Sequence, residues 1–228
     1  MITESLTLAV KGAFGRLGYQ IRQTPRRLWE GDAEFEDELA RIAGRTLVDP
    51  ARAFILRQCA RQTEAVPGQA AEVGVYRGGT ARLLAGALKP GGRILHLFDT
   101  FAGMPRTDAG KDVHREGDFA DTSLESVRGF LLGFPAVEFH AGFFPETARG
   151  LENERFSFVH LDVDIHRSIR DGLEFFYPRL AAGGMIVVDD YGVTSCPGVK
   201  TAADAFFAGR KEFPLALPTG QCLIVKLP

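Results

Sequence analysis

Cysteines are scarce in this sequence: only Cys59, Cys196 and Cys222 occur among 228 residues. They lie far apart and lack the short spacing of metal-binding or redox-active pairs, which predicts free, buried thiols in a reducing compartment, the cytoplasm. Long apolar runs are also missing, so we expect neither a signal peptide nor stable insertion in a membrane. The formal net charge is only −2, and this near-neutral balance argues against a nucleic-acid partner.

Helical spacing dominates residues 1–65. In "DPARAFILRQCARQ", Asp49 stands where a helix N-cap is expected, Pro50 fits the first turn, and apolar residues follow at helical intervals. We therefore predict an N-terminal helical extension over residues 1–65. Its basic residues are expected to form a solvated face, with a basic amphipathic helix that touches a membrane surface or a partner as the alternative. The extension is compatible with a homodimer.

Short apolar segments alternate with helical ones from residue 66 to the end of the chain. The expected strands are residues 70–75, 93–99, 137–142, 156–162 and 184–190, and the expected helices are residues 78–88, 122–132, 167–180 and 197–210. This alternation predicts a doubly wound, mostly parallel α/β sheet that forms one globular unit over residues 66–228. The final "FPLALPTGQCLIVKLP" contains two extended runs around a turn, which predicts an antiparallel C-terminal strand.

Residues 103–121, "GMPRTDAGKDVHREGDFAD", have no periodicity and are rich in glycine, aspartate and arginine. Loops of this length inside a compact domain are usually lids or disordered segments. We predict a mobile lid over a ligand site.

The first expected strand of the sheet ends in the glycine-rich turn "EVGVYRGGT". Ligands of open parallel sheets bind at the carboxyl ends of the strands, and glycines let the backbone approach them closely. The spacing is not that of a dinucleotide-binding G-x-G-x-x-G turn, and Glu72 would repel a pyrophosphate. Asp99 closes the second strand, where a carboxylate can accept hydrogen bonds from both ribose hydroxyls. Together these features favour S-adenosylmethionine, whose sulfonium end is cationic, over NAD.

Two later strands each end in a pair of carboxylates. The stretch "FVHLDVDIHRS" contains Asp162 and Asp164, and "GMIVVDDYG" contains Asp189 and Asp190. Neighbouring strands lie about 5 Å apart, and two like charges at that distance repel by about 3 kcal/mol at an effective dielectric constant of ~20. Four ionised carboxylates therefore need a cation or several protons. Oxygen ligands select a hard dication such as Mg²⁺, with Mn²⁺ and Ca²⁺ as alternatives.

Residues beside these carboxylates leave other interpretations open. Some of the acids could instead cap the following helices or pair with Arg167 and Arg170. His160 is expected to be a core histidine, whereas His166 is a candidate general base or acceptor contact.

Seven segments carry a family resemblance: "PGQAAEVGVYRGGTARLLAGAL", "LFDTFAGMP", "GDFADTSLESV", "HAGFFPETA", "LDVDIHRSI", "YPRLAAGGMIVVDDYG" and "CPGVKTAADAFF". In order and approximate spacing they resemble the macrocin O-methyltransferase family over about residues 50–226. The resemblance implies a class I, Rossmann-like enzyme. Such an enzyme uses S-adenosylmethionine and a divalent metal to methylate sugar hydroxyls of natural products.

The resemblance also implies roles for individual residues. Asp162, Asp189 and Asp190 match the metal ligands and Asp164 matches the general base, with His166 kept as a second catalytic candidate. The implied cofactor-binding residues are Glu72 and Gly74 at the methionine part, Asp99 at the ribose, Gly142 and Phe143 at the adenine, and Ser123, to which we add Tyr76, Thr80, Thr100 and Asp162 from the same strand ends.

The sequence departs from the family beside the expected acceptor. Residues 165–167 replace a common aromatic pair and acid, and Ile169 replaces a usual threonine. The expected acceptor is a small hydroxylated molecule, foremost a sugar, whose identity stays open. One alternative is a catechol-type enzyme with an aromatic pocket that includes Trp29. Another is a non-catalytic cofactor-binding protein of the same fold, against which the four acids argue.

Overall fold

The computed structural model describes residues 4–16, 27–88 and 92–228, which divide into two units between residues 31 and 32. In the first unit, helix α1 (Glu4–Arg16) exposes all of residues 8–16. The parts of the expected helical extension at residues 1–3 and 17–26 lie outside the described residues. No helix in the described part of the chain is long and apolar enough to cross a membrane.

Two helices precede the sheet in the larger unit, and aspartates begin both. Asp32 accepts a hydrogen bond from the Phe35 backbone at the start of α2 (Ala33–Ile42). Asp49 accepts from the backbone N–H groups of residues 51 and 52 at the start of α3 (Pro50–Gln62), which confirms the predicted start. Such caps stabilise a helix by about 1 kcal/mol each.

The sheet has seven strands in the order β3-β2-β1-β4-β5-β7-β6. The strands are β1 (Gln69–Val73), β2 (Leu95–Asp99), β3 (Val137–Ala141), β4 (Phe156–Leu161), β5 (Leu180–Val188), β6 (Leu215–Ala216) and β7 (Cys222–Val225). The pairs among β1 to β5 are parallel, whereas β7 runs antiparallel to both β5 and β6. The predicted fold class is confirmed, including the antiparallel C-terminal strand.

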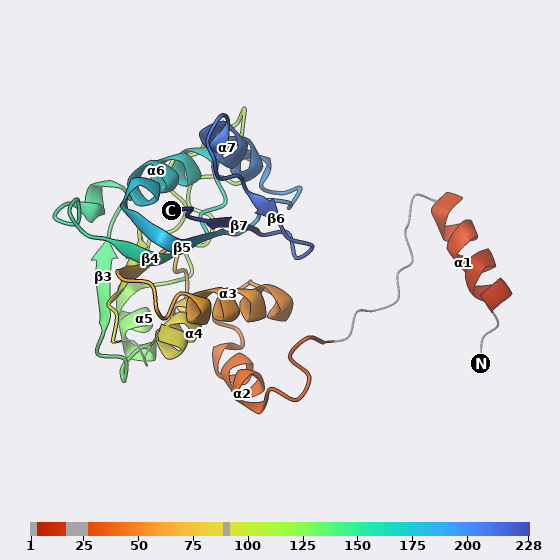
Figure 1. Ribbon diagram of the computed structural model, residues 1–228, viewed down its shortest axis with the longest axis horizontal. Helices are drawn as coiled ribbons and strands as arrows, with labels where there is room; N and C mark the ends of the chain where they lie inside the picture. Colours follow the sequence, from red (N-terminus) through yellow and green to blue (C-terminus); the bar gives the residue numbers. More distant parts are fainter. Residues whose placement is uncertain (1–3, 17–26, 89–91) are drawn as a thin grey trace. The chain divides into compact units, whose positions relative to one another are not determined.

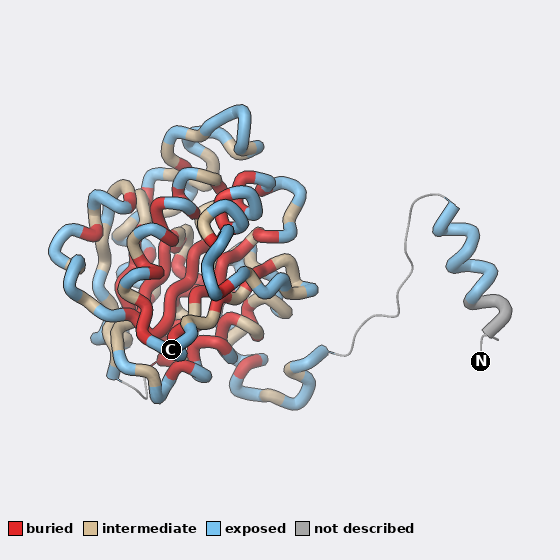
Figure 2. The backbone as a smooth tube through the Cα atoms, turned by 45° about the horizontal axis from the view of Figure 1, so that its top comes forward, coloured by how far each residue is buried: buried red, intermediate tan, exposed pale blue. Residues whose placement is uncertain are grey.

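Helices cover both faces of this sheet (Figure 1). One face packs against α6 (His166–Phe176) and α7 (Pro197–Phe207), and the other against α3, α4 (Gly79–Leu88) and α5 (Leu124–Phe130). The helix expected to reach residue 180 ends at Phe176, and Pro178 lies in the 3₁₀ turn (Tyr177–Arg179) that follows. The buried residues concentrate in the sheet between these two helical layers (Figure 2).

The chain reverses its winding between β1 and β4, and this is where the backbone is most crowded. Gly74 follows β1 with φ = +89°, and a Cβ atom on it would lie 1.7 Å from the backbone oxygen of Asp162, at the end of β4. Only glycine fits this close approach and adopts this φ without strain. The glycine thus keeps the ends of the two central strands together.

Candidate active site

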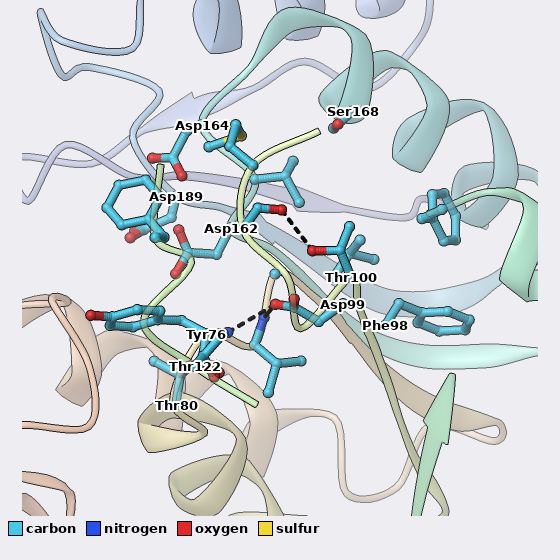
Figure 3. A pocket seen from close by; sticks show the side chains of 18 of the residues that line it. Tyr76, Thr80, Phe98, Asp99, Thr100, Thr122, Asp162, Asp164, Ser168 and Asp189 are labelled. Atoms are coloured by element: carbon cyan, nitrogen blue, oxygen red, sulfur yellow. Dashed lines mark hydrogen bonds between the residues drawn. The ribbon is translucent and has the colours of Figure 1, made fainter. Parts of the chain in front are cut away.

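A pocket opens at the carboxyl ends of β1, β2, β4 and β5 (Figure 3). This is the position expected for a ligand site in an open parallel sheet. Residues 103–105 and Phe119 form part of its wall, and the segment 103–121 contains no helix or strand. The expected lid therefore borders the pocket, and its mobility stays a prediction.

Most of the predicted site residues line this pocket: Gly74, Tyr76, Thr80, Asp99, Thr100, Gly142, Phe143, Asp162, Asp164, Asp189 and Asp190. Three others do not. Glu72 is fully buried in β1, where its Oε1 lies 2.9 Å from Nδ1 of the equally buried His160. Ser123 is the N-cap of α5 and accepts from the Ser126 backbone. His166 begins α6, and burial lowers its pKa.

Asp99 fixes the turn that follows β1. Its Oδ2 accepts hydrogen bonds from the backbone N–H groups of Val75 (2.7 Å) and Tyr76 (2.9 Å), and its Oδ1 accepts from Phe101 (2.6 Å). A carboxylate offers about four acceptor positions, so Asp99 keeps capacity for a further donor from a ligand. The same turn holds Tyr76 at φ = +51°.

The four predicted carboxylates lie together in the pocket, in two overlapping groups. Oxygens of Asp162, Asp164 and Asp190 lie within 4.8 Å of one another, and Asp162 and Asp189 form a second such group with His160. Asp164 and Asp190 adopt φ values of +57° and +56°, a backbone conformation that aspartate tolerates better than most residues. The Oδ1 atom of Asp189 is buried and has no hydrogen-bond partner among the described residues.

Crowding of these acids changes their protonation. Burial and the neighbouring carboxylates raise the pKa of Asp162 well above its usual range. Burial and Asp190 raise the pKa of Asp164 to about 7. Burial also raises the pKa of Asp189, although His160 and Arg52 act in the opposite direction. The buried Asp189 oxygen without a partner and the all-carboxylate group of Asp162, Asp164 and Asp190 together fit a hard dication.

Arg52 is a pocket residue that the sequence interpretation missed. Its Nη1 donates to Asp189 Oδ2 at 2.8 Å and to Asp190 Oδ1 at 2.9 Å, while its Nε donates to Asp49 at 3.0 Å. The arginines expected as alternative partners, Arg167 and Arg170, instead pair with Asp171 on their own helix. Arg52 lies 137 residues from Asp189 in the chain, so helical spacing alone could not reveal this pair.

The loop of residues 103–121 places two further residues, which the sequence did not reveal, beside the segment from Asp164 to His166. His114 Nε2 lies 3.9 Å from Asp164 Oδ1, and its Nδ1 lies 3.2 Å from Asp118. Asp112 Oδ1 accepts from the His166 backbone N–H at 2.8 Å and so caps α6, whose preceding residue provides no side-chain cap. The loop thus contacts this segment at its first residue, Asp164, and at its last, His166.

Cys196 completes the surroundings of Asp164. Its Sγ donates to Asp164 Oδ1 at 3.5 Å and lies 3.6 Å from His114 Nε2. Burial, with Asp164 nearby, raises the pKa of this thiol to about 12, which keeps it a neutral donor. All three cysteines are free and buried, as predicted.

Comparisons with known proteins agree with this arrangement. Residues 27–214 match the family described as macrocin-O-methyltransferase (TylF). A Streptomyces olivaceus relative, 8-demethyl-8-(2,3-dimethoxy-alpha-L-rhamnosyl)-tetracenomycin-C 4'-O-methyltransferase, is 30% identical over 77% of this chain and 76% of its own. Demethyldecarbamoylnovobiocin O-methyltransferase of Streptomyces niveus is 30% identical over 75% of this chain and 70% of its own. The solved structure of the O-methyltransferase NovP matches with a TM-score of 0.72 and 26% identity over 81% of this chain and 83% of its own.

The fold, the pocket and these relatives define an O-methyltransferase that depends on S-adenosylmethionine. Within that class, the chain belongs to the macrocin O-methyltransferase family.

Proposed function

We propose that this enzyme methylates a hydroxyl group on the sugar of a glycosylated natural product, with S-adenosylmethionine as methyl donor and Mg²⁺ or another hard dication as a second cofactor. The observation that carries the proposal is the set of four carboxylates in a pocket that also contains the Gly74 turn and Asp99. The names of the relatives support a sugar acceptor, since one is a 4'-O-methyltransferase of a rhamnosyl compound and another is mycinamicin III 3''-O-methyltransferase.

Several residues would hold the cofactor. Asp99 has free acceptor capacity for ribose hydroxyls, and the open backbone at Gly74 suits the methionine part. Gly142 and Phe143 line the pocket beyond β3 and would bound the adenine. When bound, S-adenosylmethionine supplies an electrophilic methyl group on a sulfonium. The acids in the pocket favour this cationic centre by charge.

The metal would lie among Asp162, Asp189 and Asp190. Asp162 belongs to both groups of close oxygens, and Asp189 Oδ1 lacks a partner among the described residues. A bound dication supplies Lewis acidity and holds acceptor oxygens. The chain's own contribution is to place these side chains directly after β4 and β5, where the backbone N–H groups of Asp162 and Asp189 donate to Val73 and Leu161 of the neighbouring strands.

Asp164 is the proposed general base. Its pKa of about 7 suits proton transfer near neutral pH. The Cys196 thiol donates to Oδ1, and His114 approaches the same atom, so the carboxylate is oriented from two sides. In the reaction, the acceptor hydroxyl would pass its proton to Asp164 as its oxygen bonds to the methyl carbon, while the bond from that carbon to the sulfonium breaks and leaves S-adenosylhomocysteine.

Two calorimetric titrations, one with S-adenosylhomocysteine and one with Mg²⁺, test the cofactor and the metal separately. We would compare the wild type with an Asp189→Asn/Asp190→Asn variant and with Glu174→Gln, an exposed acid on α6, as the matched control. The expected result is cofactor binding by all three proteins and Mg²⁺ binding lost only in the double variant. Absence of cofactor binding in the wild type would overturn the cofactor assignment, and Mg²⁺ binding retained by the double variant would overturn the metal assignment.

The acceptor is tested by turnover on two panels, glycosylated natural products with free sugar hydroxyls and catechols. Methylation confined to sugars is expected. Turnover confined to catechols would replace the sugar with an aromatic diol and leave the metal and base assignments intact.

A further inference from the structure

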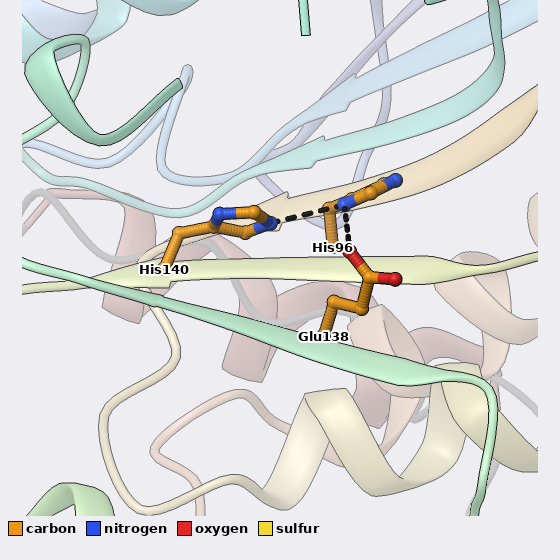
Figure 4. A group of neighbouring side chains, drawn as sticks. All are labelled: His96, Glu138 and His140. Carbon is orange, nitrogen blue, oxygen red and sulfur yellow. Dashed lines mark hydrogen bonds and ion pairs between the residues drawn. The ribbon is translucent and has the colours of Figure 1, made fainter. Parts of the chain in front are cut away.

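A second group of side chains that could hold a metal ion lies on β2 and β3, at the edge of the sheet opposite β6. Figure 4 shows its three members. His96 extends from β2, and Glu138 and His140 extend from the edge strand β3. Strand register places His96 opposite Glu138 and Phe98 opposite His140, so all three side chains emerge on one face. None of the three residues lines the methyltransferase pocket.

The three ligand atoms have the spacing of a metal site. Nδ1 of His96 lies 3.0 Å from Nε2 of His140 and 3.6 Å from Oε2 of Glu138, and all three atoms lie within 4.8 Å of one another. Two nitrogens bound to one tetrahedral Zn²⁺ at roughly 2.0–2.1 Å are separated by about 3.3 Å. The observed separation of the two nitrogens, 3.0 Å, is close to this value.

The surroundings hold the two imidazoles in place and in their neutral form. The His140 ring stacks on Phe98, with centroids 4.4 Å apart and planes at 14°, and the His96 ring meets Phe156 edge to face at 6.0 Å. Burial lowers the pKa of both histidines, and their mutual repulsion adds to this for His96. Neutral imidazole is the form that binds metals.

Glu138 supplies negative charge and an open side. Its side chain is 53% exposed, whereas that of His96 is 3% exposed, so an ion held here would face water at its remaining position. Among the described residues, Glu138 lies beside His96 and forms no ion pair with a lysine or arginine. A cation would therefore not compete with a resident positive side chain, in contrast to Asp189 and Asp190, which already pair with Arg52.

We propose that His96, Glu138 and His140 form a binding site for Zn²⁺ or a similar borderline transition-metal ion that fastens the edge strand β3 to β2. Two nitrogens and one carboxylate oxygen suit Zn²⁺, Co²⁺ or Ni²⁺, whereas Mg²⁺ prefers oxygen ligands. The chain thus carries two cation sites of opposite preference. Strand β3 leads directly into Gly142 and Phe143 of the pocket, so the ion stabilises one wall of that pocket from outside.

Equilibrium dialysis of the metal-stripped full chain against micromolar Zn²⁺, followed by elemental analysis, tests the site. Mg²⁺ in large excess is kept in the buffer to compete for the carboxylates of the pocket. The variant is His140→Ala, on the edge strand. The control is His114→Ala, which removes the histidine placed near Cys196 and Asp164. Circular dichroism checks that each variant is folded.

The expected result is one bound Zn²⁺ per chain in the wild type and in His114→Ala, with affinity at least about tenfold lower in His140→Ala. Zn²⁺ should also raise the melting temperature of the wild type but not that of folded His140→Ala. Equal Zn²⁺ binding by the wild type and His140→Ala overturns the proposal, as does loss of binding in His114→Ala alone. Failure of the wild type to retain Zn²⁺ overturns it too, and identifies the 3.0 Å contact as a hydrogen bond between two imidazoles. None of these outcomes depends on methyl transfer.

Discussion

The buried carboxylate Asp164 should lower the stability of the metal-free enzyme as pH rises. Its pKa is about 7 in the folded protein against 3.8 for the unperturbed group. A folded-state pKa that is raised means that the protonated form is favoured on folding. The contribution of Asp164 to the free energy of unfolding is therefore fully present below about pH 4 and is lost as pH rises through about 7.

Replacing Asp164 with asparagine removes this dependence. The destabilisation linked to ionisation of the wild-type side chain is roughly 4 kcal/mol at about pH 8 and roughly 1–2 kcal/mol at about pH 5. The free energy of unfolding of Asp164→Asn, relative to that of the wild type, should therefore rise by about 2–3 kcal/mol from about pH 5 to about pH 8. Methyl transfer by this variant should collapse. The side chain is 18% exposed, so solvent screening moderates the difference without reversing its sign.

Urea denaturation with a chelator present, at both pH values, measures this difference. Asp118→Asn is the control. Asp118 contacts His114 on the loop beside Asp164, but a backbone hydrogen bond from Arg115 lowers the pKa of Asp118. The reasoning is refuted if Asp164→Asn shows the same stability difference from the wild type at both pH values. Full turnover by the variant would separately reject Asp164 as the base.

Three further substitutions follow from the site. Arg52→Gln should destabilise the metal-free protein by about 3 kcal/mol in urea denaturation, because it leaves two largely buried carboxylates without their cation. The control Arg61→Gln, at an exposed arginine, should lower the stability by under about 0.5 kcal/mol. Equal losses of stability in the two variants would contradict this prediction. Gly74→Ala should abolish soluble folded protein through its clash with the β4 backbone, whereas Gly129→Ala on α5 should be neutral or stabilising, as judged by yield and circular dichroism. His114→Ala should lower kcat in a methyl-transfer assay and leave cofactor affinity unchanged; an unchanged kcat would show that the contact with Asp164 is incidental.

Local signals in the sequence were sufficient to predict the fold. The Asp49–Pro50 start of α3 and the alternation of strands and helices each depend on residues that are close in the chain, and both predictions are confirmed. The strand ends could be located for the same reason, because an apolar run stops at Asp99, Asp162 and Asp189. Parallel pairing then brings these ends to one edge without any further information.

The partners of those acids could not be predicted in this way. Arg52 reaches the acids after β5 from a helix that precedes the sheet, and His114 reaches Asp164 from a loop without periodicity. Nothing in the spacing of either residue points to its partner, since both contacts depend on tertiary packing. The histidine cluster at β2 and β3 was missed because its members become neighbours only through strand register.

The electrostatics of the pocket follow from how unevenly its acids are compensated. Arg52 pairs with Asp189 and Asp190, whereas burial, and after it the neighbouring carboxylates, raise the pKa values of Asp162 and Asp164. A dication among the acids would share Asp190 with Arg52 and meet Asp162 without such a competitor. Cation binding, ionisation of the acids and the Arg52 contact are therefore coupled, because each changes the charge felt by the others. The same imbalance that destabilises the metal-free protein near neutral pH makes the pocket attractive to a cationic cofactor.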